Sequence, residues 1–286
     1  MPVCGRPTRV STANTSLVKP PLGATELVRW KGKDGLEIEG LLTLPVHSPA
    51  GSRVPLILNI HGGPSGVFSE AFIGAPGLYP IAAFAAKGYA VLRPNPRGST
   101  GYGTPFRQRV VRDWGGLDFQ DLMAGVDSLI ARGIADPERL AVMGWSYGGY
   151  MTAWTVTQTA RFKAAAVGAG ITNHVSMYGT QDIPTVYEDY FGGLPWTAAD
   201  VYARSSPINF VHRVKTPTLL LHGENDNRVP PTQAHEFYRA IKRQGVETRM
   251  VVYPRQPHGP TEPKFQQHIM EEHLAWVEKH LSSSTW

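Results

Sequence analysis

Residues 144–149 read Gly144-Trp145-Ser146-Tyr147-Gly148-Gly149 and join two stretches of different character. They follow the apolar run Leu140 to Met143, which is typical of a buried strand, and precede Tyr150 to Gln158, whose pattern indicates a helix. A strand that turns sharply through Gly-x-Ser-x-Gly into a helix presents the serine hydroxyl at the top of a sheet. We therefore predict that Ser146 is a nucleophile.

Steric crowding explains the glycines, because a side chain at Gly144 or Gly148 would collide with the crossing strand or helix. A serine hydroxyl alone is a weak nucleophile, so a base and an acid must accompany it. In the fold that uses this turn, the chain order is serine, then Asp or Glu, then histidine.

The acid is expected in the polar loop Glu224 to Pro230, which follows the apolar run 218–223. Catalytic residues of open α/β sheets gather where strands end, and we predict that Asp226 orients the base. Glu224 is the competing acid. We rank it below Asp226 because it lies closer to the end of the strand. The structural alternative for Asp226 is a solvated carboxylate that caps the helix starting near Thr232.

Five histidines follow Asp226, namely His235, His258, His268, His273 and His280. His258 differs from the others because it lies in the loop 254–260 after a strand-like run, whereas the rest fall in helical patterns. We predict that His258 is the general base. His61 precedes the serine in the chain and is expected to be a packed structural residue.

An oxyanion site requires two backbone donors. The apolar run Val54 to Ile60 leads into His61-Gly62-Gly63-Pro64, a strand-end glycine loop that supplies one N–H, while the residue after the nucleophile supplies the other. Gly63 and Tyr147 are the predicted pair. The alternative for the loop is a tight turn that needs a glycine only for its positive φ.

Strand and helix patterns alternate along the chain. Strands are expected near Leu41–Leu44, Leu56–Ile60, Ala90–Arg93, Leu140–Met143, Ala164–Val167, Thr218–Leu221 and Met250–Tyr253, and helices near Tyr79–Lys87, Leu117–Arg132, Tyr150–Gln158, Gln233–Gln244 and Lys264–His280. This alternation favours an α/β class, with a mainly parallel sheet covered by helices on both faces. Together with the serine turn it predicts an α/β-hydrolase fold.

Six segments resemble the catalytic domain of the prolyl oligopeptidase family of serine peptidases, in its acylaminoacyl-peptidase-like branch. They are residues 34–40, 61–64, 95–103, 144–149, 222–230 and 253–259. The resemblance implies the same triad, Ser146, Asp226 and His258, and the same oxyanion donors. It implies cleavage of peptide or acyl-amino-acid amide bonds through an acyl-enzyme. A carboxylesterase for small or aromatic esters and a non-catalytic binding module of this fold are the rival functions.

Members of this family usually carry an N-terminal β-propeller, whose blades need roughly 40 to 50 residues each. The 286 residues are too few for both domains, and we expect a catalytic domain over residues 25–286 behind an N-terminal extension of residues 1–24. That extension resembles the tail of a propeller blade. A fragment of a longer chain, a truncated product and a free-standing hydrolase all fit this pattern.

An aromatic-rich stretch, residues 173–214, separates two of the expected strands. An insertion at this place roofs the nucleophile, and we expect the substrate pocket here, with Tyr187 and Trp196 as its lining residues. The alternative is that most of these aromatic side chains only pack the insertion onto the sheet.

Composition narrows the remaining choices. The net charge is +5 and the pI is near 9.3, but the basic residues are scattered, so we expect no nucleic-acid partner. A single cysteine, Cys4, excludes an internal disulfide and fits a reducing compartment. We find no apolar run long enough for a membrane span and no apolar signal-peptide core in the first residues, so we expect a cytoplasmic protein. We find no metal or dinucleotide motif and expect no metal and no cofactor. The expected partner is a short peptide, acylated amino acid or small ester, and a homo-oligomer remains open.

Overall fold

A computed structural model of the chain describes residues 8–12, 21–47, 51–75 and 77–282. Its centre is an eight-stranded sheet in the order β1-β2-β4-β3-β5-β6-β7-β8. The strands are β1 Thr25–Lys31, β2 Glu37–Thr43, β3 Val54–Ile60, β4 Ala90–Asn95, β5 Ala135–Trp145, β6 Ala164–Gly168, β7 Thr218–Gly223 and β8 Thr248–Tyr253. β2 pairs antiparallel with β1 and with β4, and all later pairs are parallel. The carboxyl ends of the parallel strands therefore meet at one edge.

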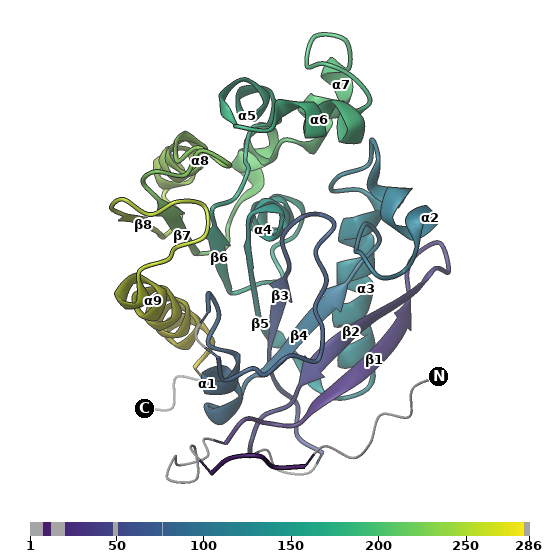
Figure 1. Cartoon of the computed structure of the whole chain (residues 1–286), viewed down its shortest axis with the longest axis vertical. Helices are drawn as coiled ribbons and strands as arrows, with labels where there is room; N and C mark the ends of the chain where they lie inside the picture. The colour runs from purple at the N-terminus through teal and green to yellow at the C-terminus, as the bar shows by residue number, and fades with distance from the viewer. Residues whose placement is uncertain (1–7, 13–20, 48–50, 76, 283–286) are drawn as a thin grey trace.

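Helices cover both faces of this sheet (Figure 1). One face packs against α3 Leu117–Ala131, α4 Tyr147–Gln158 and α8 Thr232–Arg243, and the other against α1 Ile81–Ala86 and α9 Pro263–Leu281. Within β3 the neighbours Leu56 and Ile57 belong to opposite cores, as expected of a strand that is buried on both sides. The predicted α/β-hydrolase architecture is confirmed.

A helical cap lies at the edge where the parallel strands end, at the top of Figure 1. It consists of α5 His174–Thr180, α6 Pro184–Phe191, α7 Ala199–Ser205 and a short 3₁₀ segment, Pro207–Arg213. A further short helix, α2 Thr104–Arg107, is followed by the 3₁₀ turn Gln108–Val110. The ring of Trp114 joins the cap to α4, because it contacts Tyr187 and Phe191 of α6 as well as Tyr147 of α4.

The structure adds elements that the sequence patterns did not predict, namely β1, α2 and the cap helices. β1 is an edge strand that pairs only with β2, and most of its residues are exposed. It therefore has no apolar run that would have marked it as a strand. The predicted extension of residues 1–24 lies largely outside the described residues, as does Cys4. Within the described ranges, no helix combines the length and the apolar character needed to cross a membrane.

Candidate active site

Ser146 lies between β5 and α4 with φ 63° and ψ −122°, a strained conformation for a residue that has a Cβ. The flanking glycines allow the close crossing. A Cβ at Gly148 would overlap the carbonyl oxygen of Ile60 in β3, and a Cβ at Gly144 would overlap the backbone of Gly148. The predicted steric reason for both glycines is confirmed. The turn leaves Ser146 partly exposed at the carboxyl edge of the sheet.

Asp226 and His258 come together at the same edge. Asp226 lies in the turn after β7, and His258 lies in the loop between β8 and α9. The Nδ1 atom of His258 is 2.8 Å from Oδ2 of Asp226, while Oδ1 of Asp226 accepts the backbone N–H groups of Arg228 and Val229. Glu224, the competing acid, instead accepts the backbone N–H of Arg255 at 3.0 Å. The geometry therefore pairs His258 with Asp226.

The Asp226 carboxylate is stabilised in its charged form. Burial alone would raise the pKa of Asp226, but hydrogen bonds from His222 and His258 outweigh burial and lower the pKa to about 2. His222 is a buried residue of β7 whose Nε2 lies 2.7 Å from the carbonyl oxygen of Val229 and 3.4 Å from Oδ2 of Asp226. Sequence reasoning missed His222. The available signal was a histidine at the end of an otherwise apolar strand, four positions before the acid.

The His258 loop is hydrogen-bonded to the residues next to Ser146 and next to Asp226. The indole N–H of Trp145, which precedes Ser146, donates to the carbonyl oxygen of His258 at 2.7 Å. The backbone N–H of Asn225 donates to the carbonyl oxygen of Gln256 at 3.0 Å. The first bond ties the His258 loop to the serine turn, and the second ties it to the loop of Asp226. Among the described residues, the Ser146 hydroxyl has no hydrogen-bond partner.

The glycine loop after β3 passes beside the serine. A Cβ on Gly62 would lie 3.9 Å from Oγ of Ser146. Gly63 has φ 125°, and the N–H of Gly66 donates to the carbonyl oxygen of Gly62, so the loop also forms the tight turn that was the alternative interpretation. Neither the Gly63 N–H nor the Tyr147 N–H donates a hydrogen bond to any residue that the structure describes. Both N–H groups are therefore unpaired within the described part of the chain.

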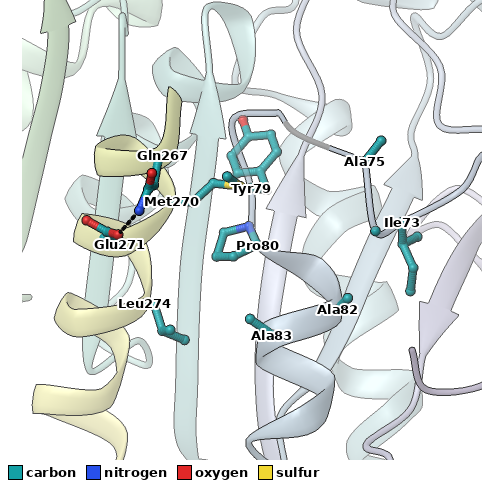
Figure 2. Close-up of a pocket in the computed structure, with 11 residues that line it drawn as sticks. Ile73, Ala75, Tyr79, Pro80, Ala82, Ala83, Gln267, Met270, Glu271 and Leu274 are labelled. Atoms are coloured by element: carbon teal, nitrogen blue, oxygen red, sulfur yellow. Dashed lines mark hydrogen bonds between the residues drawn. The ribbon is translucent and has the colours of Figure 1, made fainter. Parts of the chain in front are cut away.

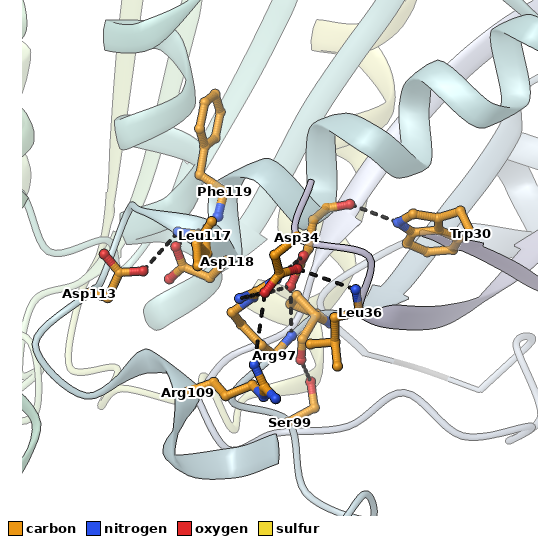
Figure 3. A network of polar contacts seen from close by, with 12 residues as sticks. Trp30, Asp34, Leu36, Arg97, Ser99, Arg109, Asp113, Leu117, Asp118 and Phe119 are labelled. Carbon is orange, nitrogen blue, oxygen red and sulfur yellow. Dashed lines mark hydrogen bonds and ion pairs between the residues drawn. The ribbon is translucent and has the colours of Figure 1, made fainter. Parts of the chain in front are cut away.

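His61 links this glycine loop to a buried polar network around Arg97, and Figure 3 shows Arg97 with Ser99 and Asp34. Nδ1 of His61 is 2.7 Å from the carbonyl oxygen of Gly62, and Nε2 of His61 is 2.9 Å from Oγ of Ser99. The segment that carries Ser99 is fixed by Arg97, which is only 1% exposed and bonds to the carboxylates of Asp121 and Asp34. The buried His61 side chain therefore connects the glycine loop to the segment of Ser99, which is the structural role predicted for it.

The two predicted pocket residues lie in different surroundings. Tyr187 is buried in the cap, where its ring stacks on Phe191 at 5.0 Å and its hydroxyl is 3.1 Å from Nδ1 of His174. Trp196 is 71% exposed and packs edge-on against Tyr178. Tyr187 thus follows the packing alternative, and Trp196 lies on the cap surface.

Two surface hollows lie outside the residues of this site. One, of about 360 Å³, has mostly apolar walls from α1, α9 and the loop before α1, on the face of the sheet that α1 and α9 cover, and none of the predicted catalytic residues lines it (Figure 2). The other, of about 460 Å³, lies between the α2 region and α6 and is lined by Arg107, Gln108, Val111, Asp189 and Tyr190. Tyr190 packs on Trp114, which packs on Tyr147, so the second hollow adjoins the aromatic cluster behind the serine.

The described residues include no group of three or more His, Cys, Asp or Glu side chains that could hold a metal ion. What they provide is a serine in a strained turn, an acid–imidazole pair and two unpaired backbone donors. This set of groups can carry acyl transfer to water.

Comparisons with known proteins found similar chains. The family model described as the prolyl oligopeptidase family matches residues 79–284. A Bacillus subtilis (strain 168) protein described as the uncharacterized peptidase YuxL is 36% identical over 284 residues, which cover 96% of this chain and 42% of that protein. The acylaminoacyl peptidase of Pyrococcus horikoshii superposes with a TM-score of 0.85 at 32% identity, over 92% of this chain and 42% of its own.

A third similar structure is a puromycin-hydrolyzing peptidase of Mycobacterium tuberculosis, with a TM-score of 0.86 and 30% identity. The match covers 92% of this chain and 40% of that one. The chain thus spans about two fifths of the length of each of these three relatives.

Proposed function

The chain belongs to the prolyl oligopeptidase family, and we propose that it is a serine hydrolase that cleaves peptide or acyl-amino-acid amide bonds. One observation carries the proposal. The 2.8 Å contact between His258 and Asp226 lies at the sheet edge where Ser146 is held with positive φ. Positive φ at a serine costs free energy, and the surrounding glycines keep the residue in that conformation.

The roles follow from which atoms are free. Because Nδ1 of His258 is bonded to Asp226, Nε2 is the nitrogen that takes the proton from Oγ of Ser146 as the serine attacks the carbonyl carbon. The N–H groups of Gly63 and Tyr147 stabilise the negative charge that develops on the carbonyl oxygen. His258 then gives its proton to the departing amine, and water releases the acyl group by the same steps in reverse order.

The choice of an amide over an ester is supported by the solved neighbours, which are described as an acylaminoacyl peptidase and a puromycin-hydrolyzing peptidase. An amine leaves only after protonation, so amide cleavage depends more strongly on His258 than ester cleavage does. A small ester is the second substrate class that the same residues can serve.

We propose that substrates enter from the cap side. The exposed ring of Trp196 is available to an apolar substrate group, and the hollow beside Tyr190 offers a cation and a carboxylate, Arg107 and Asp189, for polar ends. Tyr187 is buried inside the cap and packs on Phe191.

The test is hydrolysis of one N-acylated amino acid, offered as its p-nitroanilide and as its p-nitrophenyl ester, by the wild type and by Ser146→Ala. Cleavage of the anilide that disappears in Ser146→Ala supports the proposed peptidase. Serine-dependent cleavage of the ester alone replaces it with an esterase. Equal activity of Ser146→Ala and the wild type would remove Ser146 from the mechanism.

A further inference from the structure

Tyr147 carries two polar groups that face different surroundings. Its backbone N–H is one of the two proposed oxyanion donors at the active-site surface. Its side chain is buried, and the phenol hydroxyl donates a short hydrogen bond to Oδ2 of Asp118 in the interior. Tyr147 thus connects the proposed reaction site to a buried carboxylate that comes from a different helix and lies 29 residues away in the chain.

Asp118 is a fully buried carboxyl group without a cationic partner among the described residues. It lies in the first turn of α3, next to Phe119, and is 0% exposed (Figure 3). It accepts the backbone N–H groups of Gly115 at 3.2 Å and Phe119 at 2.7 Å. No ion pair joins it to any Lys or Arg that the structure describes, so hydrogen-bond donors and the dipole of α3 are what stabilise its carboxyl group.

The bond between Tyr147 and Asp118 limits the motion of the first residue of α4. Trp114 packs edge-on against the ring of Tyr147 at 4.9 Å, and Tyr150 packs on it at 5.6 Å, while Asp118 holds the far end of the ring through the hydroxyl. A ring held in three places leaves the attached backbone little freedom. Oxyanion stabilisation depends on a donor that is already in position before the charge develops.

We propose that Asp118 is a positioning residue for hydrolysis, which acts through the Tyr147 hydroxyl to hold the Tyr147 N–H where the oxyanion forms. The inference rests on the proposed function, because without acyl transfer there is no oxyanion to stabilise. It adds to that function a buried residue that touches neither the substrate nor the triad.

A positioning role and a merely structural role predict different kinetics. If Asp118 positions an oxyanion donor, loss of the hydrogen bond weakens binding of the transition state more than binding of the substrate, so kcat falls while KM changes little. If the bond only contributes to packing, its loss lowers stability and leaves kcat of the folded enzyme unchanged.

The experiment compares Tyr147→Phe with Tyr150→Phe. Tyr150 is a matched control, since it is also fully buried on α4, it also touches Trp114, and its hydroxyl has no hydrogen-bond partner among the described residues. We expect Tyr147→Phe to lower kcat on the anilide by about 10-fold, part of the roughly 100- to 1,000-fold cost of losing one oxyanion donor entirely. Tyr150→Phe should stay within about 2-fold of the wild type, because an unpaired hydroxyl contributes little.

A second readout is the affinity of the corresponding N-acyl amino aldehyde. Oγ of Ser146 adds to the aldehyde carbon, and the hydroxyl proton passes to His258. The carbon becomes tetrahedral, and its oxygen carries the negative charge in the proposed oxyanion site. The inhibition constant should weaken in Tyr147→Phe by the same factor as kcat. Asp118→Ala, which removes the acceptor, is the second variant, and combining it with Tyr147→Phe should cost no more than the larger single effect, because both remove the same interaction.

Circular dichroism and thermal melting establish that each variant is folded. An unchanged kcat and aldehyde affinity in folded Tyr147→Phe would overturn the positioning role and leave the proposed function standing, as would equal losses in Tyr147→Phe and Tyr150→Phe. Wild-type activity that persists in Ser146→Ala would instead overturn both.

Discussion

Asp118→Asn should change how the stability of the protein depends on pH. Burial raises the pKa of Asp118, and although the hydrogen bonds from Tyr147, Gly115 and Phe119 oppose this effect, the pKa stays at about 7 instead of 3.8. Between these two pH values the folded protein binds one proton more than the unfolded chain. Stability from this group is therefore present at low pH and is lost as the pH rises towards and through 7.

The size of the effect follows from the difference between the two pKa values. At about 1.4 kcal/mol for each pH unit, the rise from 3.8 to about 7 corresponds to about 4 kcal/mol in total. Of this, about 3 kcal/mol falls between pH 5 and pH 8. Asparagine does not titrate, so the free energy of unfolding of Asp118→Asn relative to the wild type should rise by about 3 kcal/mol over that interval.

Urea unfolding at intervals from pH 5 to pH 8, followed by tryptophan fluorescence, measures this difference. Asp136→Asn is the control. Burial raises the pKa of Asp136, but Arg139 and a backbone N–H outweigh burial and lower it, so that substitution should give a constant difference over the same range. A constant difference for Asp118→Asn as well would show that Asp118 is not a proton-binding group in the folded state, and would refute the reasoning from burial.

Three further substitutions, two of them paired with a control variant, test the site and its support. Asp226→Asn should lower kcat about 10,000-fold with little change in folding, because it leaves His258 in the wrong tautomer. The control Glu224→Gln should keep kcat within about 3-fold of the wild type. Equal losses in anilide hydrolysis would contradict the choice of Asp226 as the acid. Gly148→Ala should lower the free energy of unfolding by more than about 3 kcal/mol, because its Cβ would meet backbone that cannot yield. Gly179→Ala, which meets nothing within 4 Å, should be neutral or stabilising in the same urea titration. Arg97→Met should cost about 3 to 5 kcal/mol, because it leaves a buried carboxylate unpaired; a loss below about 1 kcal/mol would show that the network is not needed.

The serine turn was predictable because its constraint is local. A strand, two glycines and a helix within 20 residues of sequence specify the turn, and the overlap of a Cβ at Gly148 with Ile60 supplies the steric reason. The pairing of Asp226 with His258 was predictable for a similar reason, since each residue lies in a polar loop directly after a buried strand. The parallel sheet then brings the ends of those strands to one edge.

The buried supporting residues could not be found in this way. His222 lies within an apolar strand and Asp118 within an amphipathic helix, and the spacing of neither residue indicates its partner. Asp118 meets Tyr147 only after α3 and α4 pack on the same face of the sheet. Residue type also failed to separate Tyr187 from Trp196, because burial of an aromatic side chain in the cap depends on how the cap helices fold over Trp114.

The central claim is that Ser146, His258 and Asp226 act together as a catalytic triad. The most direct measurement is reaction with a fluorophosphonate probe, followed by peptide mapping of the labelled residue in the wild type and in His258→Ala. The account predicts a single label on Ser146 that is lost, or slowed by at least about 100-fold, without the imidazole. Labelling at another residue, or labelling of Ser146 at an equal rate in His258→Ala, would contradict it.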